Sequence, residues 1–199
     1  MIGFDIKPQI TSIIGENDFM GYQTNKREAD NKIGMSLRLD YFLKKKISIG
    51  SGICYNPQGI KREDLTVETW GSRFFQADID YLQIPIYITY YFKKNDNLNI
   101  KISSGIGFDY LLHVTDNLGD IVNFINSPIA EPKDRYTRLV FDAVASVGID
   151  YKITNRIYLT TAIEGMIGLN KFHKPYISGI DVDSRIISAG LILGFKYAL

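Results

Sequence analysis

The sequence is poor in several features that mark familiar classes of protein. Cysteine occurs once, at Cys54, which excludes an intramolecular disulfide and a cysteine-based metal cluster. Histidine occurs only twice, and 23 basic residues are almost balanced by 22 acidic ones, so the net charge is +1. A nucleic-acid-binding protein needs a basic face, and this composition offers no such excess. We therefore expect no cofactor, no metal and no nucleic-acid partner.

Long apolar runs are also missing. The longest stretch without Asp, Glu, Lys or Arg covers residues 47–60, and Gly, Asn, Pro and Gln interrupt it. A transmembrane helix needs about 20 mostly apolar residues, so none is predicted. No signal peptide is visible either, because residues 1–5 already begin an alternating pattern. If the protein is exported, we expect that a signal peptide has been removed.

What the sequence does contain is a two-residue alternation of apolar and polar side chains, the pattern of β-strands. Thirteen Tyr, eleven Phe and seventeen Gly also favour strands and turns over helices. Each predicted strand is long enough to cross a bilayer, which takes about 9 to 11 tilted residues. Eight strands are predicted, at residues 2–14, 33–43, 47–58, 80–92, 98–112, 138–152, 157–169 and 185–197.

The connections between these strands alternate without exception between long and short. Outer-membrane barrels have long extracellular loops, short periplasmic turns and an even number of strands. The chain is therefore predicted to form one domain over residues 1–199. We expect an all-β, eight-stranded, antiparallel, up-and-down transmembrane β-barrel in the bacterial outer membrane. Long loops are expected at 15–32, 59–79, 113–137 and 170–184, and tight turns at 44–46, 93–97 and 153–156.

The ends of the predicted strands carry aromatic and basic residues. Aromatic side chains suit the interface between membrane and water. The short turns are rich in lysine, which could pair with lipid phosphates, so outer-membrane lipids are expected partners. The aromatic residues of the apolar face near the short turns are Tyr41, Tyr90, Phe92, Tyr151, Phe195 and Tyr197.

The polar face of the strands collects charged residues that would point into the barrel. An eight-stranded barrel is just wide enough for side chains to fill it, and buried charges must pair to avoid a cost of several kcal/mol. Six acids face four bases here, a near-balance that allows self-pairing. We therefore predict a plugged polar interior. The predicted interior network comprises Arg38, Asp40, Lys101, Asp109, Asp142, Asp150, Glu164 and Lys196, together with Asp5 and Lys7.

Candidate catalytic and metal-binding residues are few. His113 and His173 fall near the ends of long loops, and a nearby serine could serve as the nucleophile of a lipid hydrolase. Such a site also needs a base and an orienting group in the right geometry, which a single sequence does not show, so we expect surface histidines without a catalytic role and a protein that is not an enzyme. Calcium binding is not predicted either, because the loop acids lack the remaining ligands of a known calcium motif. These serines and acids are Ser127, Ser178, Ser184, Asp116, Asp120, Asp181 and Asp183.

Two segments resemble the PorT-like outer-membrane β-barrel family of Gram-negative bacteria. Residues 52–59 (GICYNPQG) are similar to the third strand of that family, and residues 81–87 (YLQIPIY) are similar to its fourth. Gln83 stands where the family usually has an acid, and the chain ends in Leu199 where Phe is more usual. The resemblance implies a small eight-stranded outer-membrane protein and does not by itself imply an activity.

Three functions are compatible with these features. The first is a non-enzymatic outer-membrane barrel that supports the envelope or binds another envelope protein through its loops, for example as an accessory subunit of a larger complex. The second is a soluble, lipocalin-like ligand-binding barrel with its apolar face inward, because alternation alone does not distinguish inside from outside. The third is a membrane-embedded lipid enzyme. The loop residues expected to form a binding surface, or else to pack over the barrel mouth, are Trp70, Phe74, Phe75 and Phe124.

Overall fold

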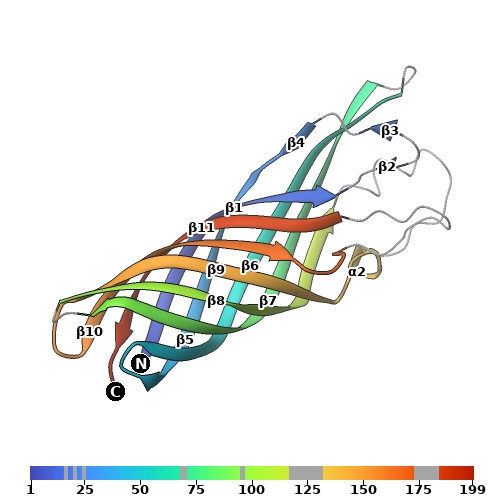
Figure 1. Cartoon of the computed structure of the whole chain (residues 1–199). Helices are drawn as coiled ribbons and strands as arrows, with labels where there is room; N and C mark the ends of the chain where they lie inside the picture. Colours follow the sequence, from blue (N-terminus) through green and yellow to red (C-terminus); the bar gives the residue numbers. More distant parts are fainter. Residues whose placement is uncertain are drawn as a thin grey trace.

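A computed structural model of the chain describes residues 1–15, 18–19, 22–23, 26–67, 71–94, 97–116, 132–172 and 184–199. Eight long strands form a closed antiparallel barrel (Figure 1). The barrel closes because the first and last strands pair, from Ile2 opposite Tyr197 to Gly15 opposite Ser184. The predicted eight-stranded antiparallel barrel is confirmed. Its strands are β1 (Ile2–Gly15), β5 (Asp30–Lys44), β6 (Ile47–Val67), β7 (Gly71–Lys94), β8 (Leu98–Asp116), β9 (Leu139–Lys152), β10 (Ile157–Gly168) and β11 (Ser184–Tyr197).

Within the parts of the long connections that the structure describes, four short elements are present. Both chain termini lie at the short-turn end of the barrel, opposite these elements (Figure 1). Among the described residues, no helix has the length and apolar character needed to cross a membrane. The short elements are β2 (Asp18–Phe19), β3 (Tyr22–Gln23), β4 (Lys26–Glu28) and α2 (Pro132–Arg135).

The connection between β6 and β7 differs from the prediction. The loop expected at residues 59–79 is mostly strand, because the ladder continues from Gly59 opposite Asp78 to Asp64 opposite Arg73. Strand β4 pairs with the same stretch of β6. The hairpin formed by these ends of β6 and β7 projects beyond the barrel wall (Figure 1). The segment was predicted as a loop because its sequence lacks the alternating apolar face that a bilayer imposes. Phe74 and Phe75 therefore lie in a strand.

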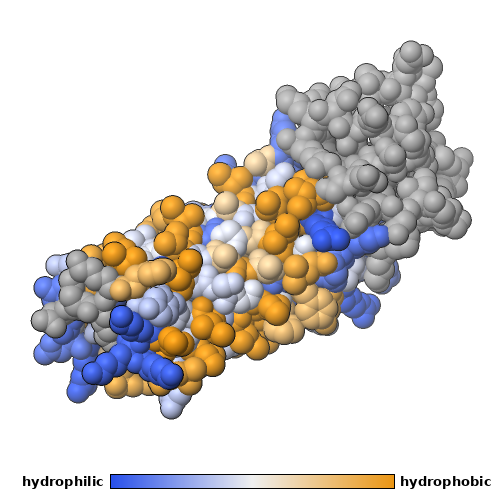
Figure 2. Space-filling model, viewed as in Figure 1, coloured by the Kyte–Doolittle hydropathy of each residue, from blue (hydrophilic) through white to orange (hydrophobic). Residues whose placement is uncertain are grey.

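The outer wall of the barrel is apolar and the inside is polar. The exposed fractions of the side chains distinguish the two faces. Phe4 is 54% and Ile163 is 65% exposed on the outer wall, whereas Lys196 on the inner face is 6% exposed. Figure 2 shows apolar side chains over much of the visible wall, with hydrophilic side chains gathered towards both ends of the described part. A soluble lipocalin-like barrel would place its apolar face inside, so the lipocalin alternative is not favoured.

The interior changes character along the barrel axis. Near the short turns and through the middle it is charged, but at the long-loop end it is filled by an apolar cluster. Two residues outside the long strands, Tyr136 and Phe172, join this cluster, with their ring centroids 6.1 Å apart. The apolar cluster therefore covers the charged interior from the loop side. Its other members are Ile13, Ile60, Ala77, Ile79, Tyr81, Leu111, Val114, Val140 and Ile186.

Candidate functional site

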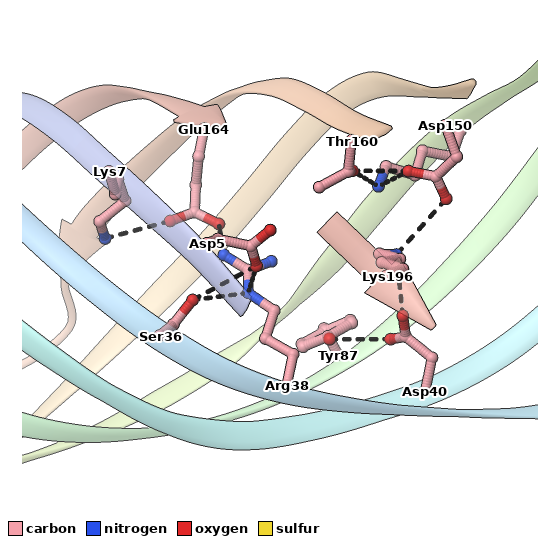
Figure 3. A network of polar contacts seen from close by, with 11 residues as sticks. Asp5, Lys7, Ser36, Arg38, Asp40, Tyr87, Asp150, Thr160, Glu164 and Lys196 are labelled. Carbon is pink, nitrogen blue, oxygen red and sulfur yellow. Dashed lines mark hydrogen bonds and ion pairs between the residues drawn. The ribbon is translucent and has the colours of Figure 1, made fainter. Parts of the chain in front are cut away.

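The charged cluster nearest the short turns centres on Lys196 of β11. Its Nζ lies 2.8 Å from Asp40 Oδ2 and 3.4 Å from Asp150 Oδ2 (Figure 3). Lys101 pairs with the other oxygen of Asp150 and donates to Thr160 Oγ1 at 2.7 Å. Side chains from β5, β8, β9, β10 and β11 thus meet in one ion-pair network across the barrel.

A glycine on β6 makes room for the aromatic member of this network. Tyr87 of β7 donates its hydroxyl to Asp40 Oδ1 at 2.8 Å. Its ring crosses directly over Gly50, where a Cβ atom would also lie 2.6 Å from Asp40 Oδ1. Any larger residue at this position would displace the ring, because real Cβ atoms do not approach other atoms so closely.

A second charged cluster lies further from the short turns and centres on Arg38. Its Nε lies 3.0 Å from Asp5 Oδ2, and its Nη2 lies 3.7 Å from Glu164 Oε2. Lys7 Nζ reaches the other oxygen of Glu164 at 3.2 Å. The guanidinium carbon of Arg38 also lies 5.7 Å from the ring centroid of Tyr87, which joins the two clusters.

The third polar layer is acidic. Asn56 donates to Asp109 Oδ2 at 3.1 Å, and Gln83 donates to Asp142 Oδ2 at 3.4 Å. Both amide groups also contact the sulfur of Met166, so the two acids share one small layer. Each of the four interior bases pairs with an acid of the first two clusters, whereas the part of the chain that the structure describes gives these two acids no ion pair.

The charged interior is almost filled. Two cavities lie beside Arg38, and they offer about 20 and 10 Å³ to the centre of a water molecule. A cavity needs roughly 10 to 15 Å³ by this measure to hold one water molecule. These two cavities can therefore hold an isolated water molecule or two.

The structure distributes the predicted interior residues over these three layers. Asp40, Lys101, Asp150 and Lys196 meet in the first cluster, and Arg38 and Glu164 meet in the second. Asp109 and Asp142 lie apart from both. Sequence reasoning missed Asn56, although it shares its strand face with Cys54 and could have been found from the alternation.

The predicted loop surface falls largely outside the described residues. Trp70 and Phe124 lie outside them altogether, and for Phe74 and Phe75 only the backbone in β7 is described. The loop between β8 and β9 is tied to the barrel where Arg135 Nη2 donates to Asp116 Oδ1 at 2.9 Å. Tyr136 also donates to Asp116, and its burial raises the pKa of its hydroxyl well above the usual value.

Among the described residues, the candidate histidines, serines and carboxylates do not come together as a catalytic or metal-binding site. His113 is exposed on β8, and its Nε2 lies 3.0 Å from Thr115 Oγ1. Ser184 is buried in β11, while His173, Ser127 and Ser178 lie outside the described residues. Within the described ranges, no group of three or more His, Cys, Asp or Glu side chains is placed to hold a metal ion. Asp116 is engaged by Arg135 and Tyr136, and Asp120, Asp181 and Asp183 are not described.

Solved structures share this architecture. The outer membrane protein OprG from Pseudomonas aeruginosa superposes with a TM-score of 0.50 and 12% identity, covering 98% of this chain and 94% of that one. The outer membrane protein AlkL, determined in DMPC lipid bilayers, gives a TM-score of 0.53 and 11% identity, covering 99% of this chain and 89% of that one. At these identities the likeness shows the fold alone.

The family comparison is consistent with the barrel. No protein with a curated description matches the sequence significantly. The family described as "Outer membrane protein beta-barrel domain" matches residues 4–174. This confirms the outer-membrane location and the general class, while the narrower PorT-like resemblance stays a prediction. The chain belongs to the outer membrane protein β-barrel domain family and is a protein of the bacterial outer membrane.

Proposed function

We propose that this protein is a non-enzymatic outer-membrane barrel with a closed interior, which supports the envelope and binds another envelope protein at its loop end. The observation that carries the proposal is the filled interior, where ion pairs occupy the space that a channel would need. The apolar cluster at the loop end adds a second barrier to water and ions.

The loop end supports the binding role. The hairpin of β6 and β7 extends beyond the barrel wall as a paired ladder, and β4 widens it to three strands. Such a backbone is a more rigid platform than a long loop, and binding residues are commonly presented on rigid scaffolds. We assign the contact surface to Trp70, Phe74, Phe75 and Phe124, because the first three lie in or beside this hairpin.

The accessory role in a larger envelope complex is part of this proposal, and the PorT-like resemblance at residues 52–59 and 81–87 shows only where the chain is similar to that family. Both segments lie in barrel strands, β6 and β7, directly below the projecting hairpin. The part of the molecule that resembles this family is thus the part that carries the proposed binding platform.

Two experiments test the two halves of the proposal. Purified barrel in planar bilayers should give no large, stable conductance, and stable open channels would refute the closed interior. For binding, a Phe74→Ser/Phe75→Ser variant should lose crosslinks to its envelope partner that the wild type forms. An Ile84→Ser/Ile86→Ser variant on the lipid-facing wall of β7 is the matched control, and equal crosslinking by all three proteins would refute the loop surface.

A further inference from the structure

The charges of this nearly neutral protein are unevenly distributed along the barrel. The three short turns and the adjoining strand ends, residues 44–46, 93–97 and 152–156, carry seven bases and one acid, Asp96. The rest of the chain carries 16 bases and 21 acids. We call the seven bases the basic rim: Lys44, Lys45, Lys46, Lys93, Lys94, Lys152 and Arg156.

Four members of the basic rim are available for an external ligand. Lys44, Lys45, Lys46 and Arg156 are exposed. Within the described ranges none of these four side chains forms an ion pair, in contrast to every base inside the barrel. A surface of one sign without counter-charges attracts a ligand of the opposite sign.

The basic rim adjoins the belt of aromatic residues on the outer wall. Tyr41, Tyr90 and Tyr197 are exposed next to the short turns, as are Phe92, Tyr151 and Phe195. Arg156 Nη1 donates to the hydroxyl of Tyr197 at 3.1 Å, so its guanidinium lies at the depth of the belt. Tyrosine side chains of such belts sit at the level of the lipid headgroups.

We propose that the basic rim binds the phosphate groups of anionic phospholipids in the leaflet that the short turns face. The position of the basic rim favours a lipid over a soluble acidic partner as its ligand. Arg156 is held against the apolar wall by Tyr197, which places it beside the lipid headgroups. Basic residues next to a membrane surface are attracted to anionic lipids. This attraction falls off within a Debye length, which becomes shorter as the salt concentration rises. The inference rests on the membrane location and is independent of the proposed loop partner.

The test measures which lipids contact the inserted barrel. The wild type is reconstituted in phosphatidylcholine bilayers with trace spin-labelled phosphatidylglycerol or phosphatidylcholine, and the motionally restricted fraction is read by electron paramagnetic resonance. At low salt we expect phosphatidylglycerol to be preferred about twofold or more. At 1 M salt, where the Debye length is about 3 Å, the preference should fall towards one.

Two variants locate the preference. Lys44→Gln/Lys45→Gln/Lys46→Gln removes three charges of the basic rim and should lose most of it. Lys61→Gln/Lys133→Gln/Arg138→Gln removes three charges at the opposite end and should keep it. The heat-dependent gel shift of a folded barrel shows whether the triple variant folds. If it does not fold, a second rim variant, Lys152→Gln/Arg156→Gln, is used, and it should also reduce the preference for phosphatidylglycerol. Equal contact of both lipids with the wild type, or equal loss in the rim and control variants, would overturn the proposal.

Discussion

Replacing Lys196 by Met should strongly destabilise the barrel. Its Nζ lies 2.8 Å from Asp40 Oδ2 and 3.4 Å from Asp150 Oδ2, and the side chain is buried. Asp150 would keep Lys101, but Asp40 would have no base within the described network. Removing one partner of a buried ion pair costs about 3 to 5 kcal/mol, because the other charge remains buried and unpaired.

Denaturant unfolding in lipid vesicles measures this cost. With a urea dependence of about 3 kcal/mol per molar, the loss moves the unfolding midpoint by roughly 1 to 1.7 M. The matched variant Lys196→Met/Asp40→Leu removes both charges and should recover most of the loss, because an ion pair replaced by apolar groups is often neutral. Two results would contradict this prediction. One is a free energy of unfolding of the single variant within about 1 kcal/mol of the wild-type value, and the other is a double variant that is no more stable than the single one.

Three further changes test other parts of the interior and wall by the same unfolding measurement. Asp142→Asn should keep or raise the stability, by up to about 1 kcal/mol, because the described residues give this buried carboxyl group no ion pair to lose; a lower midpoint would contradict this. Gly50→Val should cost about 1 to 3 kcal/mol by displacing the ring of Tyr87 from Asp40, and a neutral effect would show that the ring moves freely. Ile163→Lys, on the lipid-facing wall, should cost about 2 to 4 kcal/mol, whereas Asn155→Lys in an exposed short turn should cost much less; equal costs would argue against a membrane-facing wall.

Much of the barrel follows from simple sequence patterns. Alternation assigns residues such as Lys101 and Asp109 to one face of β8, and the loop lengths orient the barrel in the membrane. Alternation by itself leaves inside and outside undecided. The connections resolve this choice, because a soluble barrel has no physical reason to keep every long loop at one end.

The features that sequence did not predict depend on pairing between distant strands. Asp109 and Asp142 come to share a layer because β8 and β9 pair with Gly107 opposite Asp142 and Asp109 opposite Val140. A shift of register would separate them, and single strands carry no register information. The projecting parts of β6 and β7 are hard to predict for another reason. They pair through their backbones without an alternating apolar face, so their sequence carries no strand pattern.

The pairing of β1 with β11 has a consequence for how the protein is made. Lys196 and Asp40 are separated by 156 positions, and Lys7 and Glu164 by 157. Neither pair can form before the C-terminal strand meets the first one, so a partly assembled sheet leaves these charges without their partners. Contacts between such distant positions also form slowly. The barrel therefore cannot be stabilised strand by strand, and its interior becomes compatible with a membrane only at the step that closes the ring.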